Sequence, residues 1–369
     1  MSVRLATVAV FAGLAVLGCK GDGSSPAAVG SASQAAKLPS PPADVSLNGS
    51  GATFPNPLYQ KWVAAYQASE KGVRINYQSV GSGAGIKAIS DRTVDFGATD
   101  APMTDDQLGK ATGKILHIPT TLGAVVVTYN VKDVPDHLKI TPDVLAGIFL
   151  GDVKKWNDPR ITALNVGVKL PDQAIGVSWR SDGSGTTAVF TDYLCHVSTG
   201  FKDKVGSATS VKWPVGSGSK GNDGVTNQIK QTPGSIGYVE LAYARQTKLP
   251  TMDLRNKAGK FVEASLEAIA AAAAGSLGKI PADMRISIVD AEGDMAYPIA
   301  AFTYILVYED GTDAAKAGAL AKFLWWGIHD GQKLGGPLHY AALPSEVVSK
   351  AEVLLKLLKA SGKPLLEGK

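Results

Sequence analysis

The sequence predicts an α/β protein built from two compact units, and three observations support this fold class. The chain has 369 residues, more than one ordinary hydrophobic core uses. Hydrophobic residues make up 45% and charged residues 19% of the chain, the balance of a folded globular protein. From Leu47 onward, short strand-like runs alternate with helical runs, without an internal repeat of fixed period.

The spacing of apolar residues predicts the first elements after Leu47. Residues 57–72 carry apolar side chains at helical spacing and end at a glycine, so a helix is expected there. Residues 73–80 alternate apolar and polar side chains, which is the period of a strand. Two further apolar runs, residues 94–100 and 123–131, are strand candidates.

The same pattern continues to the end of the chain. A helix is predicted over residues 141–156, with Thr141 as its cap and Pro142 in its first turn. The other predicted elements are strands at 174–179 and 302–308 and helices at 187–197, 265–275, 313–326 and 345–360.

The first residues predict an export signal that is not part of the fold. Arg4 precedes the apolar run LATVAVFAGLAVLG, which is too short to span a bilayer as a helix. The run ends in VLGC, which resembles a bacterial lipobox, so residues 1–18 are predicted to be a signal peptide and Cys19 a lipid-modified first residue. An ordinary export signal with an unused cysteine is the alternative.

A flexible tether is predicted over residues 19–46, because this segment is rich in Ser, Gly, Ala and Pro and has no apolar period. A lipid and a tether together hold a soluble body near a membrane, in the periplasm or at the cell surface. The other cysteine, Cys195, lies in an apolar helical pattern and is predicted to be a buried small hydrophobe. If Cys19 is acylated, Cys195 has no partner for an internal disulfide.

Charge and composition argue against several functions. The formal net charge is only +4, and lysines and arginines are spread without a basic run, so no nucleic acid partner is expected. The five histidines lie outside any metal-spaced pair, and the chain has no G-x-S-x-G elbow. We therefore predict no metal, no cofactor and no catalytic residue.

Three turns that contain Gly and Ser each lead into a helical pattern: NGSGATFPNP at residues 48–57, SVGSGAGIKAI at 79–89 and SWRSDGSGTT at 178–187. Such turns direct backbone N–H groups and small hydroxyls outward at a helix N-terminus, where the helix dipole also favours an anion. One such turn is usually only a cap. Three in one chain indicate an anion site, and Arg180 in the third offers a planar fork for two oxygens of a tetrahedral oxyanion.

A nucleotide site is the weaker interpretation of these glycines. None of the three turns has the Gly-Lys-Ser/Thr ending of a P-loop. The segment GSGSKG at residues 216–221 matches GxGxxG, and Glu240 lies where a ribose-binding acid is expected. However, Pro214 interrupts the preceding strand and Pro233 shortens the following helix. The overlapping segment KGNDG, residues 220–224, is predicted to be a structured turn without a ligand role.

Seven blocks of sequence, in order from about Leu47 to the C-terminus, resemble the extracytoplasmic phosphate-binding protein of bacterial phosphate ABC transporters. These blocks are GSGATFPNPLYQKW, YQSVGSGAGIKAI, VDFGATDAPM, GIFLGDVKKWND, RSDGSGTTAVFTDYL, VKWPVGSGSKGNDGV and GSIGYVELAYA.

The resemblance implies a two-lobed periplasmic-binding-protein fold of type II, with two crossover strands and a ligand in the cleft between the lobes. The first lobe would contain residues 47–128 and 300–369, and the second lobe residues 129–299. It also implies high-affinity binding of inorganic phosphate outside the cytoplasmic membrane, delivery to the permease subunits of an ABC transporter, and a monomer anchored by the lipid on Cys19.

The resemblance implies that eight residues of this chain contact the ligand and that Asp182 orients Arg180. Gly83 departs from the family, which often has a second serine there. The implied phosphate-binding residues are Thr53, Phe54, Ser82, Asp100, Arg180, Ser184, Gly185 and Thr186.

An aspartate in an anion site has a physical reason. At neutral pH phosphate keeps at least one proton, whereas sulfate keeps none. A carboxylate at Asp100 therefore accepts a hydrogen bond from phosphate and repels a fully ionised anion. Because an unpaired buried charge costs several kcal/mol, the discrimination can be large.

Three alternatives stay open at this point. The ligand can be another tetrahedral oxyanion, arsenate or sulfate. The serine-rich turns can belong to a phosphate-ester hydrolase, although the chain shows neither an activated nucleophile nor a metal cluster. A lipid-anchored scaffold or adhesin is the third possibility, but it has no need for Arg180 and Asp100 to converge on one ligand.

Overall fold

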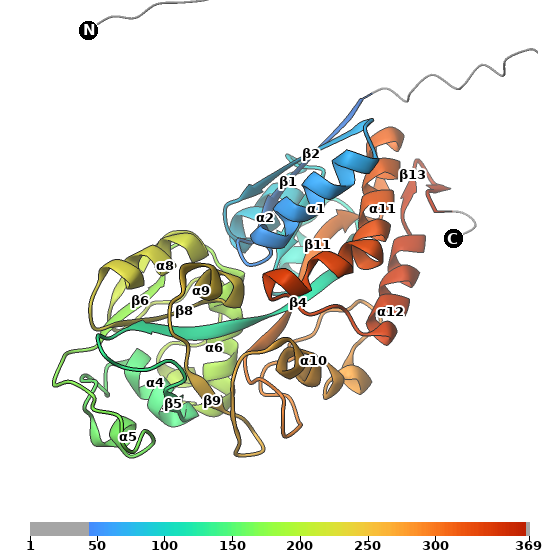
Figure 1. Cartoon of the computed structure of the whole chain (residues 1–369). Helices are drawn as coiled ribbons and strands as arrows, with labels where there is room; N and C mark the ends of the chain where they lie inside the picture. Colours follow the sequence, from blue (N-terminus) through green and yellow to red (C-terminus); the bar gives the residue numbers. More distant parts are fainter. Residues whose placement is uncertain (1–43, 367–369) are drawn as a thin grey trace, which may run out of the picture. The chain divides into compact units, whose positions relative to one another are not determined.

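The computed structural model describes residues 44–366, which lie in one compact unit of the chain. Eight strands of this unit form one mixed sheet (Figure 1). In the order in which they pair, they are β2 (Val73–Ser79), β1 (Val45–Gly51), β3 (Phe96–Thr99), β11 (Ala300–Tyr308), β4 (Ile115–Asn130), β8 (Ser235–Glu240), β6 (Gly176–Arg180) and β7 (Ser217–Ser219).

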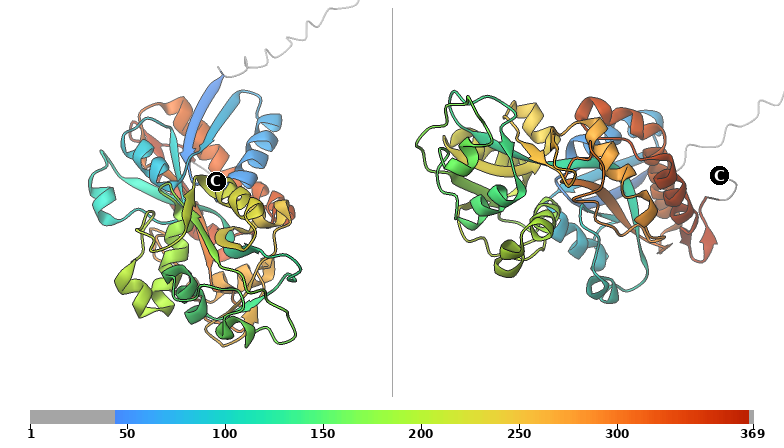
Figure 2. Two further views of the ribbon diagram at one scale, coloured as in Figure 1. Left: turned by 90° about the vertical axis from the view of Figure 1, so that its left-hand side faces the viewer. Right: turned by 90° about the horizontal axis from the view of Figure 1, so that it is seen from below.

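The sheet consists of two parallel halves joined by antiparallel strands. Strand β1 pairs in parallel with β2 and β3, and β6 pairs in parallel with β7 and β8. The long strand β4 pairs antiparallel with β11 through residues 115–124 and with β8 through residues 125–130. It runs from one group of elements to the other in Figure 1, and Figure 2 shows the same two groups from other sides. We call the part around β2-β1-β3 the first lobe and the part around β8-β6-β7 the second lobe.

Helices pack against both half-sheets, as an α/β chain requires to cover its strands. The α-helices are α1 (Asn56–Ser69), α2 (Ser82–Ser90), α3 (Asp105–Gly109), α4 (Pro142–Leu150), α5 (Pro159–Thr162), α6 (Gly185–Val197), α7 (Thr199–Lys204), α8 (Gly221–Gln231), α9 (Leu241–Thr247), α10 (Leu266–Ala274), α11 (Ala314–Ile328) and α12 (Ser345–Lys356). None of the helices among the described residues combines the length and the apolar character that crossing a membrane demands.

Short elements complete the unit. Two small sheets consist of β5 (Lys139–Ile140), β9 (Asp253–Arg255) and β10 (Phe261–Val262), and of β12 (Asp310–Gly311), β13 (Lys359–Ala360) and β14 (Lys363–Pro364). The 3₁₀ turns are η1 (Leu277–Lys279), η2 (Asp330–Leu334) and η3 (Gly336–Leu338).

The core follows the central strands and the aromatic faces of the helices. Every residue of β4 except Asn130 is buried, because this strand lies in the middle of the sheet. In the first lobe, Trp62 of α1 is fully buried, packs against Phe323 and Trp326 of α11, and donates its indole N–H to the Gly331 carbonyl oxygen at 2.8 Å. These contacts hold α1 and α11 side by side, so the turn before α1 has a fixed support.

The predicted α/β class is confirmed, but several helices end earlier than predicted, among them α1, which stops at Ser69 and not at Gly72. Helix α4 stops at Leu150 because Gly151 adopts a left-handed conformation with φ of 82°, so the prediction of a helix to residue 156 was wrong. Thr141 is at the cap position, although its side chain caps no backbone N–H. Helix α12 ends at Lys356, not at residue 360, because Lys359 and Ala360 pair with β12 and with β14.

Other local predictions also need correction. Strand β1 begins at Val45, two residues before the expected start of the folded body. Cys195 is a free thiol that packs against the core but is half-buried, not fully buried as predicted. The segment KGNDG is not a turn alone, since Gly221 opens helix α8. The predicted signal peptide, Cys19 and nearly all of the tether lie outside the described residues.

Candidate anion-binding site

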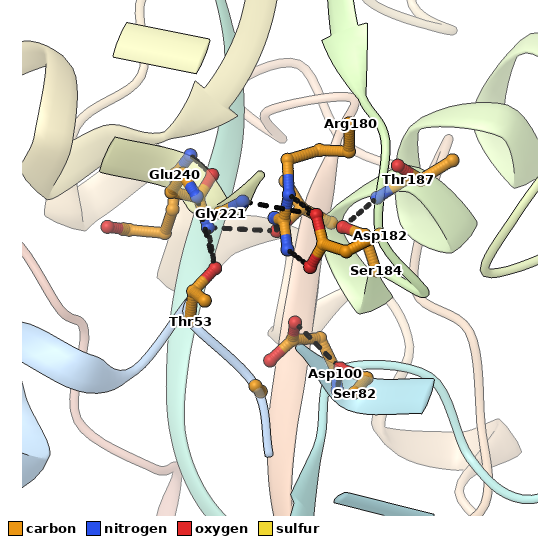
Figure 3. A network of polar contacts seen from close by, with 12 residues as sticks. Thr53, Ser82, Asp100, Arg180, Asp182, Ser184, Thr187, Gly221 and Glu240 are labelled. Atoms are coloured by element: carbon orange, nitrogen blue, oxygen red, sulfur yellow. Dashed lines mark hydrogen bonds and ion pairs between the residues drawn. The ribbon is translucent and has the colours of Figure 1, made fainter. Parts of the chain in front are cut away.

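The residues singled out in the sequence meet at the carboxyl ends of the parallel strands. Thr53 follows β1, Asp100 follows β3, and Arg180 is the last residue of β6. In open α/β sheets this edge is where ligands bind, because the turns after the strands and the N-termini of the helices converge there. Figure 3 shows Thr53 and Asp100 facing the pair formed by Arg180 and Asp182.

Arg180 is held in a fixed orientation by Asp182. Its guanidinium donates from Nε to Asp182 Oδ1 at 2.8 Å and from Nη2 to Asp182 Oδ2 at 2.6 Å (Figure 3). The backbone N–H of Gly221 donates to the same Oδ1 at 3.1 Å. Burial alone would raise the pKa of Asp182, but the hydrogen bonds and the charge of Arg180 outweigh it and hold that pKa below its ordinary value. The pair is therefore ionised, and Arg180 has only Nη1 outside the fork.

Asp100 is a buried carboxyl group in the first lobe. Its Oδ1 accepts a hydrogen bond from Thr303 Oγ1 at 2.8 Å, and its Oδ2 accepts a longer one from Ser82 Oγ at 3.4 Å. Burial raises the pKa of Asp100 from 3.8 to about 7, against the lowering effects of Thr303, Arg180 and Ser82. At neutral pH this carboxyl group is poised between its two protonation states.

Two helix N-termini point at the same region. Helix α2 begins at Ser82, and helix α6 begins at Gly185. Ser184 caps α6 by accepting the Thr187 backbone N–H at 3.0 Å (Figure 3), which leaves its hydroxyl hydrogen for another acceptor. A helix that starts here brings its dipole and its first N–H groups to the site.

Glycines allow the two lobes to approach closely. A Cβ atom at Gly185 would lie 2.4 Å from both Asp100 Oδ2 and Ser82 Oγ, so only glycine fits between them. At Gly81, which has φ of 101°, a Cβ atom would lie 2.4 Å from Asp182 Oδ2. The backbone N–H of Gly83 also donates to the Gly183 carbonyl oxygen across the lobes at 2.9 Å.

The first turn is fixed by contacts from both lobes. Phe54 is fully buried, and its carbonyl oxygen accepts a hydrogen bond from Tyr340 Oη at 2.7 Å. The carbonyl oxygen of Thr53 accepts one from Tyr243 Oη of the second lobe at 2.6 Å. The buried side chain of Thr53 accepts from Asn222, which also contacts Thr186. All eight implied ligand residues and Asp182 thus lie around one region.

Two polar residues of this region were not predicted to belong to the site, namely Thr303 and Asn222, and Asn222 was expected only in a turn without a ligand role. Asn222 is fully buried in the first turn of α8, and Thr303 lies in the middle of the apolar strand β11. A threonine inside the run FTYILVY was a signal for Thr303, because a hydroxyl in a buried strand requires a partner. For Asn222 the signal was weaker, namely an asparagine directly after a glycine that opens a helix.

The described residues contain no cluster of three or more His, Cys, Asp or Glu side chains suited to a metal ion. His117 is buried, accepts the Met103 backbone N–H at 3.0 Å, and has a pKa lowered to about 4 by burial. It is a neutral acceptor at pH 7. The site offers donors, the guanidinium of Arg180 with its partner Asp182, and the carboxyl group of Asp100, which is chemistry for holding an anion.

The raised pKa of Asp100 gives a testable pH dependence of stability. Between pH 3.8 and about 7 the folded state binds more protons at this group than the unfolded state does. Asp100 thus contributes stability that is complete below its unfolded pKa and is lost as the pH rises through its folded pKa. Each unit of raised pKa corresponds to about 1.4 kcal/mol. We expect Asp100→Asn to flatten the fall in unfolding free energy between pH 4 and 8.

Denaturant unfolding of anion-free protein at a series of pH values measures this effect. Asp106→Asn, at an exposed position of α3, is the control and should keep the wild-type pH dependence. The comparison concerns the slope of stability against pH, so a constant loss of stability in either variant does not affect it. Parallel curves for wild type and Asp100→Asn would contradict the raised pKa.

Comparison with known proteins places this site in a family. The chain matches the PBP superfamily domain over residues 33–329. It is 43% identical over 312 residues to the phosphate-binding protein PstS of Pasteurella multocida (strain Pm70), which covers 84% of this chain and 90% of that protein. It is 44% identical over 309 residues to the phosphate-binding protein PstS of Xylella fastidiosa (strain 9a5c), which covers 84% of each.

A solved structure agrees with the two-lobed fold. The high affinity periplasmic phosphate-binding protein PfluDING, solved with bound phosphate, superposes with a TM-score of 0.65 at 20% identity and covers 84% of this chain and 93% of that chain. The expected architecture is thereby confirmed. By its sequence, the chain belongs to the PBP superfamily and, within it, to the family of the phosphate-binding proteins named PstS.

Proposed function

We propose that this protein binds inorganic phosphate outside the cytoplasmic membrane and delivers it to an ABC permease for import. The observation that carries the proposal is one buried acceptor, Asp100, placed among donors that include the fixed guanidinium of Arg180. A fully ionised anion needs only donors, whereas a partly protonated one also needs an acceptor for its hydrogen. The names of the relatives, all phosphate-binding proteins, support the same ligand.

Each lobe contributes part of the proposed site. Thr53, Phe54, Ser82 and Asp100 contact phosphate from the first lobe, with Phe54 donating through its backbone N–H. Arg180, Ser184, Gly185 and Thr186 donate from the second lobe, and Asp182 orients Arg180. Because the ligand bridges both lobes, binding favours their closed arrangement, and the closed form is the one that a permease recognises.

The remaining parts of the proposal concern the chain as a whole. The lobes comprise residues 47–128 with 300–369 and residues 129–299, and hinge motion occurs where β4 and the segment that leads into β11 pass between them. The lipid on Cys19 and the tether keep a monomer near the membrane surface. The relatives are named as binding proteins, and we infer binding without turnover for this chain as well.

Calorimetry on protein stripped of phosphate by unfolding and refolding tests the ligand. We expect saturable heat with phosphate and none with sulfate, because the carboxylate of Asp100 has no hydrogen to accept from sulfate. Arsenate, with a similar protonation state, should bind as well. Absence of phosphate heat would contradict the proposal and favour a scaffold, and a preference for sulfate would exclude Asp100 as the acceptor.

Incubation with a chromogenic phosphate ester tests the hydrolase alternative. Turnover of the ester that is abolished in the Ser184→Ala variant would support this alternative.

A further inference from the structure

Asn222 lies in the proposed site although it has no place in the expected ligand set. It is fully buried in the first turn of α8, in the second lobe. Its nearest polar partners include Thr53 of the first lobe, which is 169 residues away in sequence. A buried amide that joins two lobes and touches two ligand-binding hydroxyls has a role beyond packing.

The orientation of the Asn222 amide is fixed by a backbone group. Oδ1 accepts the Glu240 backbone N–H at 3.0 Å, so the oxygen end of the amide must face β8. Nδ2 then faces the site, where it donates to Thr53 Oγ1 at 2.8 Å and to Thr186 Oγ1 at 3.1 Å. Both amide hydrogens are used, one on each threonine.

A count of lone pairs shows how the hydrogen bonds from Asn222 restrict the hydroxyls of Thr53 and Thr186. Thr53 Oγ1 also accepts the Asn222 backbone N–H at 3.3 Å, and Thr186 Oγ1 also accepts Arg180 Nη1 at 3.4 Å. A hydroxyl has two acceptor lone pairs and one hydrogen. Because N–H groups occupy both lone pairs of each threonine, each hydroxyl can only donate to a further partner.

We propose that Asn222 is a positioning residue that sets Thr53 and Thr186 as hydrogen-bond donors toward the bound oxyanion and links the lobes in the closed form. This inference rests on the proposed function. An anion requires donors, and a hydroxyl that is free to rotate presents a lone pair as readily as a hydrogen. With Asn222 in place, the two hydroxyls already direct their hydrogens toward the ligand position before the ligand binds, so the hydroxyls do not have to reorient on binding.

The variant Asn222→Asp tests the inference with little change of shape. Aspartate keeps the size of the side chain and an acceptor for the Glu240 N–H, but it offers acceptors to both threonines. Their hydroxyls would then donate to the new carboxylate, and a negative charge would face the ligand. We expect phosphate Kd at pH 8 to rise by about 100-fold, from the loss of two donors in a buried site.

A pH profile separates this role from a merely structural one. Protonation of the new carboxyl group restores one donor and removes its charge, so the ratio of variant to wild-type Kd should fall by about tenfold between pH 8 and pH 5.5. The site is surrounded by charged or titratable groups that are present in every variant, namely Asp100, Asp182, Arg180, Glu240 and Tyr243, and phosphate itself titrates. Their effects cancel in the ratio for Asn222→Ala, which adds no charge, so this variant is the reference for the pH profile. Asn222→Ala should bind about tenfold more weakly than wild type, with a ratio that does not change with pH.

Asn165→Asp is the matched control. Asn165 is also buried, its Oδ1 accepts the Lys139 N–H at 2.8 Å, and its Nδ2 donates to the carbonyl oxygens of Lys139 and Ile161 at 3.0 and 2.9 Å. It has the same pattern of contacts but lies outside the proposed site, so its phosphate Kd should stay within about twofold of wild type.

The outcomes distinguish the two proposals. Wild-type protein that does not bind phosphate would overturn the proposed function and this inference with it. Wild type that binds, with Asn222→Asp within threefold of it at pH 8 or with a ratio independent of pH, would overturn only the inference. If circular dichroism shows that Asn222→Asp is unfolded, Asn222→Ala decides, and binding within twofold of wild type would then overturn the inference.

Discussion

Replacing Arg180 with alanine is expected to weaken phosphate binding by roughly a thousandfold, because truncating one partner of a buried charge contact with a ligand costs about 4 kcal/mol of binding free energy and each 1.4 kcal/mol is a factor of ten. The guanidinium side chain is 1% exposed and that of Asp182 is 13% exposed, so neither is screened by water. Without Arg180, burial raises the pKa of Asp182, and above that pKa its carboxylate lies next to the anion and repels it. The variant loses an attraction and gains a repulsion.

Three further variants make this prediction specific. Arg180→Lys keeps the charge without the two-nitrogen fork and should bind at an intermediate strength. The double variant Arg180→Ala/Asp182→Ala should bind more tightly than Arg180→Ala alone, because the stranded carboxylate is gone. Arg160→Ala is the matched control, since Arg160 forms the same kind of fork with Asp158, from Nε at 2.9 Å and from Nη2 at 2.8 Å, but at an exposed position.

Calorimetry with phosphate gives the dissociation constants of the wild type and of the four variants, and thermal unfolding shows whether each variant is folded. A Kd for Arg180→Ala within about threefold of wild type would exclude the guanidinium as a ligand contact. A double variant no better than the single one would mean that Asp182 does not repel the anion when Arg180 is absent.

The sequence predicted the parts of the site that are local in the chain. The three turns with Gly and Ser each lead into a helix, and their strands end at the same edge of the sheet, as with Thr53 after β1 and Arg180 at the end of β6. The fork between Arg180 and Asp182 spans two residues, and the family resemblance assigned Asp182 to orienting Arg180. A local pattern is sufficient where the partners are near each other in sequence.

Contacts between distant segments could not be predicted in this way. Thr303 donates to Asp100 from 203 residues away, and Asn222 reaches Thr53 from 169 residues away. The sequence can signal a buried polar residue, as at Thr303, but it does not name the partner. The pairing of β11 with β3 and the approach of α8 to the first turn give Thr303 and Asn222 their partners. The ends of α4 and α12 were wrong for a related reason. Apolar spacing continues past both, while Gly151 and the pairing of β13 end the helices.

Replacing Asp100 with asparagine is expected to lower the preference for phosphate over sulfate by at least about 100-fold. In the wild type, Thr303 donates to Oδ1 at 2.8 Å, and Oδ2 accepts only the longer bond from Ser82 at 3.4 Å, so we expect Oδ2 to face the ligand. As a carboxylate it accepts the hydrogen of phosphate and repels sulfate, which has none. The amide of asparagine offers a donor or a neutral acceptor at the position of Oδ2, so no negative charge of residue 100 repels sulfate there. A repulsion of several kcal/mol between two buried charges is large enough to support a change of this size in the preference.

The pKa of Asp100, raised by burial to about 7, adds a pH dependence with a definite sign. Above pH 7 the group is ionised and rejects sulfate. Below pH 7 it is increasingly protonated, so it can donate its O–H to a sulfate oxygen, and the discrimination of the wild type should weaken between pH 8 and pH 5.5. In Asp100→Asn the ratio of sulfate to phosphate Kd, corrected for the protonation of phosphate in solution, should not depend on pH.

Competition calorimetry with both anions at pH 8 and pH 5.5 measures these ratios. Asp192→Asn is the control for charge alone. Asp192 and Asp100 both line a pocket of about 120 Å³ that none of the other implied ligand residues lines, and Asp192 accepts its hydrogen bond from Ser287. The variant removes one negative charge near Asp100, and it should keep the wild-type preference at both pH values. If Asp192→Asn and Asp100→Asn changed selectivity equally, the negative potential around Asp100 would reject sulfate. The hydrogen-bond geometry of Asp100 would then have no special part in the choice of ligand.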